Sequence, residues 1–113
     1  LIRYTQIDYD RKMAIIAEHT DEEGKKRMLG VVRLIADPYN ETAEFAIVVG
    51  DPWHGQGLGN AFTDMILEIA RERGYQKITA NVLKDNFIMK HIFEQRDFDI
   101  VGNEDMWYAE LEL

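Results

Sequence analysis

The sequence contains no cysteine. This absence excludes disulfide bonds, a thiolate nucleophile and a thiolate metal site, and it favours a reducing compartment. The chain also lacks an apolar run close to the roughly 18 residues that cross a bilayer. Its first residues, LIRY, have neither the charged nor the apolar region of a signal peptide. We therefore expect a soluble, cytoplasmic protein with no membrane partner.

Basic residues are scarce relative to acidic ones. The 113 residues include 13 Lys and Arg against 21 Asp and Glu, which gives a formal net charge of -8 and a pI of about 4.8. This balance argues against a nucleic-acid partner. It suits a cationic partner such as an amine or a lysine-bearing protein, although a charge that serves only solubility is the simpler explanation. The sequence leaves the oligomeric state open, with a homodimer among the alternatives.

Metal-binding and standard nucleotide-binding motifs are also missing. His19, His54 and His91 lie in separate predicted elements without the spacing of metal ligands, so we expect no metal site. The stretch DPWHGQGLGNAF at residues 51–62 is rich in glycine, but it lacks the Lys and Ser/Thr of a P-loop. Its Gly-x-Gly-x-Gly spacing also differs from the Gly-x-Gly-x-x-Gly of the dinucleotide-binding fingerprint.

The hydrophobic pattern predicts one α/β (α+β) domain over residues 1–113, because the length fits a single core and 46% of the residues are hydrophobic. The predicted order is strands 11–18, 28–36 and 43–49, helix 57–74, strand 76–83, helix 86–95, and strands 98–101 and 106–113. This order predicts a mixed central sheet flanked by helices, with strands 43–49 and 76–83 as parallel neighbours. The first strand begins early and leaves little sequence to cover one face of the sheet, so we expect that the N-terminal part of the domain is missing.

The glycine-rich stretch lies directly before the first predicted helix. A helix N-terminus has unpaired N–H groups and a partial positive charge, and glycines let an anionic ligand approach the backbone. The stretch is therefore a candidate phosphate-binding loop. A tight strand-to-helix turn without a ligand is the alternative, and the glycines alone favour that alternative.

Two ordered motifs give the chain a resemblance to the GCN5-related N-acetyltransferase (GNAT) family. The segment FAIVVGDPWHGQGLGNAF resembles the family's acetyl-CoA motif, Gln/Arg-x-x-Gly-x-Gly/Ala, with the glycines on Gly57 and Gly59. The segment NFIMKHIFEQRDF at residues 86–98 is similar to a family segment with Asn, then Ala, then Leu-Tyr-Glu-Lys-x-Gly-Phe. TQIDYD and TAEFAIVV further resemble the acetyltransferase domain of bacterial protein lysine acetyltransferases. The resemblance extends from the first predicted strand to the last and implies the GNAT acyl-CoA N-acyltransferase fold.

The resemblance implies acetyl-CoA as the cosubstrate, without a metal. Backbone N–H groups of residues 55–60 would bind the pyrophosphate, and residues 47–49 would hydrogen-bond the pantetheine arm. The residues implied in cofactor binding are Ile47, Val48, Val49, His54, Gly55, Gln56, Gly57, Leu58, Gly59, Asn60, Asn86, Met89 and Phe93. As an alternative to a pantetheine contact, Asn86 serves only as the N-cap of its helix.

Acyl transfer to an amine needs a base, because an ammonium group with a pKa of about 10.4 must lose a proton before it attacks. The resemblance implies this role for Glu44, on the strand before the glycine-rich stretch. Strand alternation puts Glu44 on the same face as Ala46 and Val48 and opposite Phe45. The alternative is a solvated glutamate at a strand edge.

Three positions depart from the family pattern. His54 stands where Gln or Arg is usual, which would make binding of the pyrophosphate depend on pH. Phe93 replaces a tyrosine that serves as general acid in many members, so the thiolate would leave unprotonated or another donor would act. Arg96 and Asp97 lie where a glycine commonly precedes the aromatic residue. Arg96 or Lys90 is either a contact to a CoA phosphate or, more simply, a solvated charge.

We therefore predict an N-acetyltransferase that transfers the acetyl group of acetyl-CoA to an amine by direct attack in a ternary complex. A protein lysine is the preferred acceptor. The alternatives are a small-molecule amine acetyltransferase and a non-catalytic acyl-CoA-sensing module. Phe93 and the missing N-terminal part favour the sensing module, whereas Glu44 argues against it.

Overall fold

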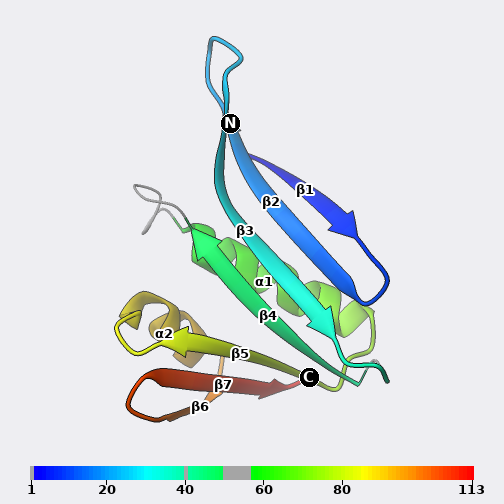
Figure 1. The fold of residues 1–113 in the computed structure, drawn as a ribbon, viewed down its shortest axis with the longest axis vertical. Coiled ribbons are helices and arrows are strands. Elements are labelled where there is room, and N and C mark those ends of the chain that lie inside the picture. Colours follow the sequence, from blue (N-terminus) through cyan, green and yellow to red (C-terminus); the bar gives the residue numbers. More distant parts are fainter. Residues whose placement is uncertain (1, 40, 50–56) are drawn as a thin grey trace.

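The computed structural model describes residues 2–39, 41–49 and 57–113 of the chain. Within these ranges the backbone forms seven strands and two helices (Figure 1). In chain order they are β1 (Ile2–Asp8), β2 (Lys12–Thr20), β3 (Lys26–Ala36), β4 (Thr42–Val49), α1 (Leu58–Glu72), β5 (Lys77–Leu83), α2 (Phe87–Glu94), β6 (Asp99–Gly102) and β7 (Met106–Glu112). Neither of these helices is long and apolar enough to cross a membrane.

The strands form one mixed sheet in the order β1-β2-β3-β4-β5-β7-β6. β4 and β5 pair in parallel, and the other neighbouring strands pair antiparallel. The parallel pair follows from the β4-α1-β5 connection, because a helix carries the chain back so that the next strand runs in the same direction. The predicted mixed sheet and its parallel neighbours are therefore confirmed.

Strand β1 was not predicted from the sequence, so the predicted order of elements is wrong at its start. β1 pairs with β2 along its full length at the edge of the sheet. Six of its seven side chains are exposed and only Thr5 is half-buried. Its sequence alternates apolar and polar residues only over residues 2–5, and Ile7 breaks this period, so the alternating run is too short to reveal the strand.

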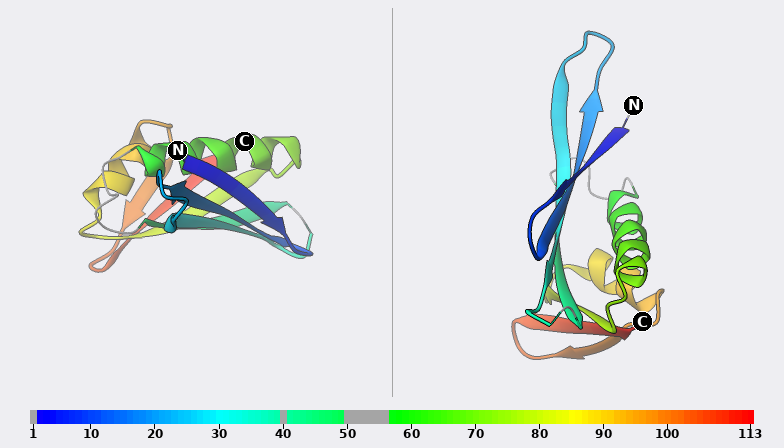
Figure 2. Two further views of the ribbon diagram at one scale, coloured as in Figure 1. Left: turned by 90° about the horizontal axis from the view of Figure 1, so that it is seen from above. Right: turned by 90° about the vertical axis from the view of Figure 1, so that its right-hand side faces the viewer.

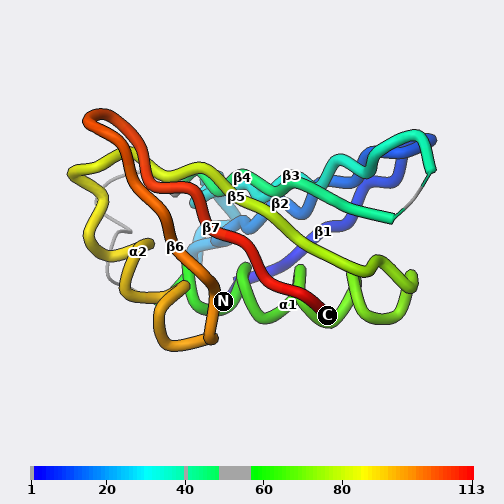
Figure 3. The backbone as a smooth tube through the Cα atoms, turned by 90° about the horizontal axis from the view of Figure 1, so that it is seen from below, coloured from blue at the N-terminus to red at the C-terminus, as the bar shows by residue number. Residues whose placement is uncertain are grey.

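Both helices cover the same face of the sheet (Figures 2 and 3). Phe62 of α1 and Phe93 of α2 are buried beneath them, as is Phe45 on β4. The rings of Phe45 and Phe93 lie 5.5 Å apart in an edge-to-face arrangement, a geometry that stabilises aromatic pairs. The hydrophobic core therefore lies between the two helices and this face of the sheet. Burial of each such side chain there contributes about 1.5–3 kcal/mol.

The opposite face of the sheet, called the open face below, is not covered by either helix (Figure 3). Strand register places on it the side chains of Ile7, Ala14, Ile16, Val31, Arg33, Ile35, Glu44, Ala46, Val48, Thr79 and Asn81. Several of these residues are apolar and still exposed, with 47% of Ile35 and 64% of Val48 accessible to solvent. β2 and β3 therefore carry apolar side chains on both faces, as strands covered on both sides do.

Candidate functional site

A cleft opens where β4 and β5 separate. The two strands pair from Thr42–Lys77 to Phe45–Ala80, and no pair follows. Beyond that point β4 continues along β3, and β5 continues along β7. The edges of β4 and β5 that face each other therefore have no strand partner there. The cleft has a volume of about 160 Å³.

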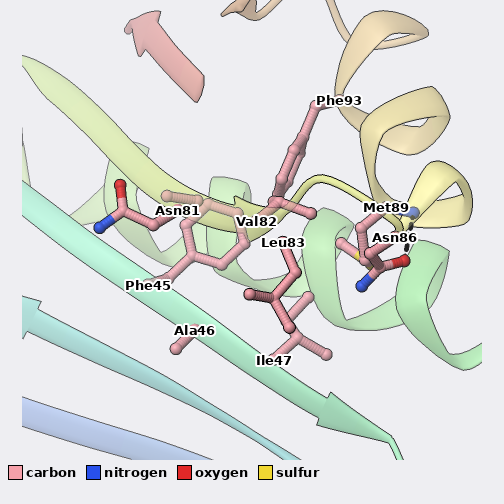
Figure 4. Close-up of a pocket in the computed structure, with 10 residues that line it drawn as sticks. Phe45, Ala46, Ile47, Asn81, Val82, Leu83, Asn86, Met89 and Phe93 are labelled. Atoms are coloured by element: carbon pink, nitrogen blue, oxygen red, sulfur yellow. Dashed lines mark hydrogen bonds between the residues drawn. The ribbon is translucent and has the colours of Figure 1, made fainter. Parts of the chain in front are cut away.

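The lining of the cleft is mostly apolar. It consists of Phe45, Ala46, Ile47, Ala80, Asn81, Val82, Leu83, Asn86, Met89 and Phe93 (Figure 4). Only two of these side chains are polar, those of Asn81 and Asn86. Unpaired strand edges can hydrogen-bond an extended ligand as they would a further strand. The cleft is therefore suited to a narrow, extended ligand that carries both amide groups and apolar segments.

Four of the residues predicted to bind a cofactor meet in this cleft: Ile47, Asn86, Met89 and Phe93. They come from three parts of the chain, β4, the turn before α2, and α2 itself. Val48, which was predicted with them, instead has its side chain on the open face, so it can contribute to the cleft only through its backbone. The side chain of Val49 lies outside the described residues.

The N-cap role of Asn86 is confirmed, and its contact with a pantetheine arm stays a prediction. Its Oδ1 accepts a hydrogen bond of 3.2 Å from the backbone N–H of Met89, which makes Asn86 the N-cap of α2. The same side chain lines the cleft. Since an amide has both an acceptor oxygen and two N–H donors, capping leaves the Nδ2 group of Asn86 available to a ligand.

The N-terminus of α1 has the features of an anion site. Its N-cap, Gly57, has a φ of 78° and provides no side-chain cap, and the first turn holds no acidic residue. Unpaired N–H groups and the positive end of the helix dipole therefore remain without a negative partner from this turn. Of the other predicted loop residues, Asn60 is exposed in the first turn, whereas His54, Gly55 and Gln56 lie outside the described residues.

Two predicted loop residues have structural roles within α1. Leu58 is buried in the core at 4% exposure. A Cβ atom at Gly59 would lie 3.0 Å from Ile92 Cδ1 and 3.2 Å from Met89 Sδ. Glycine at position 59 therefore allows α1 to approach α2 closely. The sequence motif did not indicate this packing role.

Glu44 lies beside the end of the cleft where the strands still pair. It is the residue before Phe45, the last β4 residue paired with β5, and its register partners are Ile35 and Thr79. Its side chain is exposed on the open face with Ala46 and Val48, while Phe45 is 2% exposed on the other. The predicted alternation is confirmed. An acceptor that approached from the open face would meet this carboxylate.

Arg96 and Lys90 are engaged with protein groups. Arg96 forms two hydrogen bonds with the carboxylate of Asp64 on α1, 2.8 and 3.1 Å long, and a third with the carbonyl of Ile92. This hydrogen bonding lowers the pKa of Asp64. The Nζ atom of Lys90 lies 3.6 Å from Oε1 of Glu94 and 4.6 Å from the ring centre of Trp107. The prediction that Arg96 is a solvated charge is therefore wrong, because Arg96 links the two helices.

Asn81 is the polar cleft residue that was not predicted from the sequence, and the apolar lining residues Phe45, Ala46, Ala80, Val82 and Leu83 were not predicted as site residues either. It lies on β5 between the buried residues Ala80 and Val82, with its side chain exposed on the open face. The one signal in the sequence is an asparagine within a strand, where this residue type is depleted. That signal cannot show which neighbour the side chain meets, because the neighbour is distant in sequence.

The combination of a mixed sheet, a cleft between separating parallel strands and a glycine-led helix defines the class of protein. A model of the acetyltransferase (GNAT) family matches residues 2–98, and the chain therefore belongs to this family. The fold expected from the sequence motifs is confirmed.

Particular relatives can be named within the family. The chain is 34% identical to acetyltransferase Pat of Mycolicibacterium smegmatis over 64 residues, which are 56% of this chain and 19% of Pat. It is 28% identical to an amino-acid acetyltransferase of Mycobacterium tuberculosis over 81 residues, 71% of this chain and 45% of that protein. The chain thus spans less than half the length of these curated relatives.

Solved structures give the same fold. The GNAT domain of S. lividans PAT superposes with a TM-score of 0.72 and 24% sequence identity, over 91% of this chain and 61% of that one. At this level of identity the similarity establishes the fold alone, so the activity has to be argued from the site.

Proposed function

We propose that this chain is an acetyl-CoA-dependent N-acetyltransferase. The observation that carries the proposal is the separation of β4 and β5 after the Phe45–Ala80 pair. The cleft formed there has unpaired strand edges for the amide groups of a pantetheine arm and apolar side chains for its methylene groups. The uncapped N-terminus of α1 follows β4 in the chain and would bind the pyrophosphate.

Glu44 would act as the general base on the open face. Acetyl-CoA, when bound, supplies the acetyl group and a thiolate leaving group. Glu44 accepts a proton from the acceptor ammonium, and the free amine then attacks the carbonyl carbon of the thioester. A C–N bond forms, the C–S bond breaks, and the nitrogen loses its second proton to solvent at the exposed open face. Because a thiol has a pKa of about 8.5, the thiolate can leave without a proton from a residue at the position of Phe93.

A protein lysine is the acceptor that we propose first. The preference rests on the TQIDYD and TAEFAIVV motifs and on the similarity to Pat. Glu44 is exposed, and an exposed base is accessible to a side chain on the surface of another protein. The similarity to an amino-acid acetyltransferase supports a second candidate, a small-molecule amine. A non-catalytic acyl-CoA sensor would use the same cleft without turnover.

Calorimetric titration with acetyl-CoA and CoA, followed by free-thiol release with lysine peptides or amino acids, tests the function. We expect binding of both ligands and release that depends on an added amine. Thiol release with lysine peptides would support a protein substrate, and release with amino acids alone would support a small-molecule substrate. Binding without release for any amine would support the sensor, and no binding of either ligand would contradict the cofactor assignment.

Replacing the proposed base is the more specific test. We expect Glu44→Gln to lower kcat by about 100-fold or more, since general base catalysis contributes about 10²- to 10⁴-fold. Binding of acetyl-CoA should be unchanged, because Glu44 does not line the cleft. Glu68→Gln, an exposed glutamate on α1, is the matched control. Unchanged turnover in Glu44→Gln would remove Glu44 from the mechanism.

A further inference from the structure

Asn81 carries the one cleft-lining polar side chain that no described residue engages. Asn86, the other polar side chain of the cleft, already caps α2 through its Oδ1. Within the described ranges, no hydrogen bond reaches the amide group of Asn81. Figure 4 shows the two amides at opposite ends of the lining side chains, with Phe45, Val82 and Leu83 between them. A ligand in the cleft would therefore find a free amide at the Asn81 end.

The Asn81 end of the cleft is also the end nearest Glu44. Ala80 is the last β5 residue that pairs with β4, so Asn81 is the first β5 residue beyond the ladder. Thr79, two residues earlier, is the register partner of Glu44, and residues two apart on a strand share a face. Strand spacing and rise then place the Cα atoms of Glu44 and Asn81 about 8 Å apart. Both side chains lie on the open face.

The proposed reaction needs a hydrogen-bond donor at this place. As the amine attacks, the carbonyl oxygen of the thioester gains negative charge, and donors directed at it lower the barrier. Backbone N–H groups on the unpaired edge of β4 can donate here, but of the neighbouring side chains Glu44, as a carboxylate, can only accept, and Ala46 on the opposite strand has no polar group. The amide of Asn81 offers two N–H donors. No packing role accounts for Asn81, because its side chain is exposed.

We propose that the amide N–H of Asn81 donates a hydrogen bond to the carbonyl oxygen of the acetyl group that is transferred. Asn81 would then be a catalytic residue that acts together with Glu44. This inference rests on the proposed function, since it requires acetyl-CoA in the cleft with its thioester beside the end of the β4–β5 ladder. Asn81 lies outside both the glycine-rich stretch and the motif at residues 86–98, so neither motif indicated this role.

The test compares two ligands that differ only in the acetyl group. Calorimetry on Asn81→Ala should show affinity for acetyl-CoA reduced by about 3- to 10-fold, the value of one hydrogen bond. Affinity for CoA should be unchanged, because CoA lacks the carbonyl group. Asn81→Asp keeps the shape of the side chain but removes its N–H donors. It should therefore also lower the affinity for acetyl-CoA relative to the affinity for CoA. This measurement needs no knowledge of the acceptor.

Turnover and a matched variant complete the experiment. With an acceptor that supports thiol release, kcat of Asn81→Ala should fall by at least about 10-fold. One such donor in a site without water is worth about 100- to 1,000-fold in kcat, and the exposure of Asn81 to solvent reduces this value. Gln95→Ala, which removes an exposed amide at the end of α2, should change neither ligand's affinity. Melting temperatures of all variants verify that they fold.

The outcomes separate the inference from the function on which it rests. Equal loss of affinity for acetyl-CoA and CoA would mean that Asn81 shapes the cleft, and no loss of either affinity together with an unchanged kcat would mean that it does not act on the acetyl group. Both results overturn the inference while the proposed function stands. Failure of the unsubstituted protein to bind either ligand would overturn the proposed function and the inference together.

Discussion

Asp97 is the one described non-glycine residue with a positive φ, 63°. It follows α2, where the N–H of Phe98 bonds to the carbonyl of Phe93 and the N–H of Asp97 to that of Glu94. This pair of bonds is a Schellman motif, in which Asp97 takes the left-handed position. The rings of Phe98 and Phe93 lie 4.8 Å apart and supply the hydrophobic contact of the motif. Helix α1 ends with the same bonding pattern, and there the left-handed residue is Gly74.

We expect Asp97→Gly to stabilise the protein by about 0.5–1 kcal/mol. A left-handed conformation costs a non-glycine residue about 1–2 kcal/mol, and the entropy that glycine gains in the unfolded chain offsets part of the benefit. Urea unfolding at pH 7 measures the change. Gly74→Ala, the opposite change at the end of α1, should destabilise the protein. A destabilised Asp97→Gly variant would contradict the assignment of strain to this residue.

Single residues also show how far the sequence predicts the site. The alternation around Glu44 and the N-cap role of Asn86 were predictable because both depend on neighbours in sequence. The packing role of Gly59 was not, since Met89 and Ile92 are about thirty residues away on another helix. The motif at residues 86–98 marked the position of Asp97 as one that usually has glycine, and its positive φ gives the physical reason.

At the scale of elements, the bond between Arg96 and Asp64 connects α2 to α1. α1 carries the proposed anion site, and α2 carries two side chains of the cleft. The side chain of Arg96 is 18% exposed and that of Asp64 is 66% exposed, so solvent screens the pair on one side. The contact therefore holds the two parts of the candidate site in register with a modest energy.

This pair should make a pH-dependent contribution to stability. The hydrogen bond from Arg96 lowers the pKa of Asp64 below its unfolded value. The stabilisation is thus present above about pH 4, the unfolded pKa of an aspartate, and it is lost as the pH falls through the lower folded pKa. We expect Asp64→Asn to reduce the free energy of unfolding at pH 7 by less than about 1 kcal/mol, because the carboxylate is largely exposed.

Urea unfolding at pH 7 and at pH 3 measures this contribution. The difference between Asp64→Asn and the unsubstituted protein should be smaller at pH 3. Arg96→Lys should lose part of the same stabilisation at pH 7, because an ammonium cannot form two parallel bonds to the carboxylate. A difference between Asp64→Asn and the unsubstituted protein that stays constant over this pH range would show that the ion pair does not contribute.

The elements that the sequence predicted are those with strong burial patterns. α1 buries Phe62, Ile66 and Ala70 at helical spacing, and its end near Gly74 was predicted as a helix C-cap. β1 was missed because it lies at an edge, buries almost nothing and alternates apolar and polar residues only over residues 2–5. The position at which β4 and β5 separate could be inferred only from the family resemblance, since strand separation is a property of two segments that are far apart in the sequence.

At the scale of the molecule, the net charge of -8 acts differently on the two proposed substrates. Acetyl-CoA carries anionic phosphates, which the protein as a whole repels, although the N-terminus of α1 attracts them at contact. A lysine acceptor is attracted by the same net charge. On the open face, Glu44 adds to this attraction close to the proposed reaction site.

Raising the ionic strength should therefore change the two KM values in opposite directions. Salt shortens the Debye length from about 30 Å at 0.01 M to about 10 Å at 0.1 M. Over this range we expect KM for acetyl-CoA to fall, because long-range repulsion is screened, and KM for a lysine peptide to rise. Steady-state thiol release measures both KM values. The control is a lysine peptide brought to zero net charge by added glutamates, and its KM should change little with salt. If both KM values rise together, local contacts rather than the charge of the whole molecule control binding.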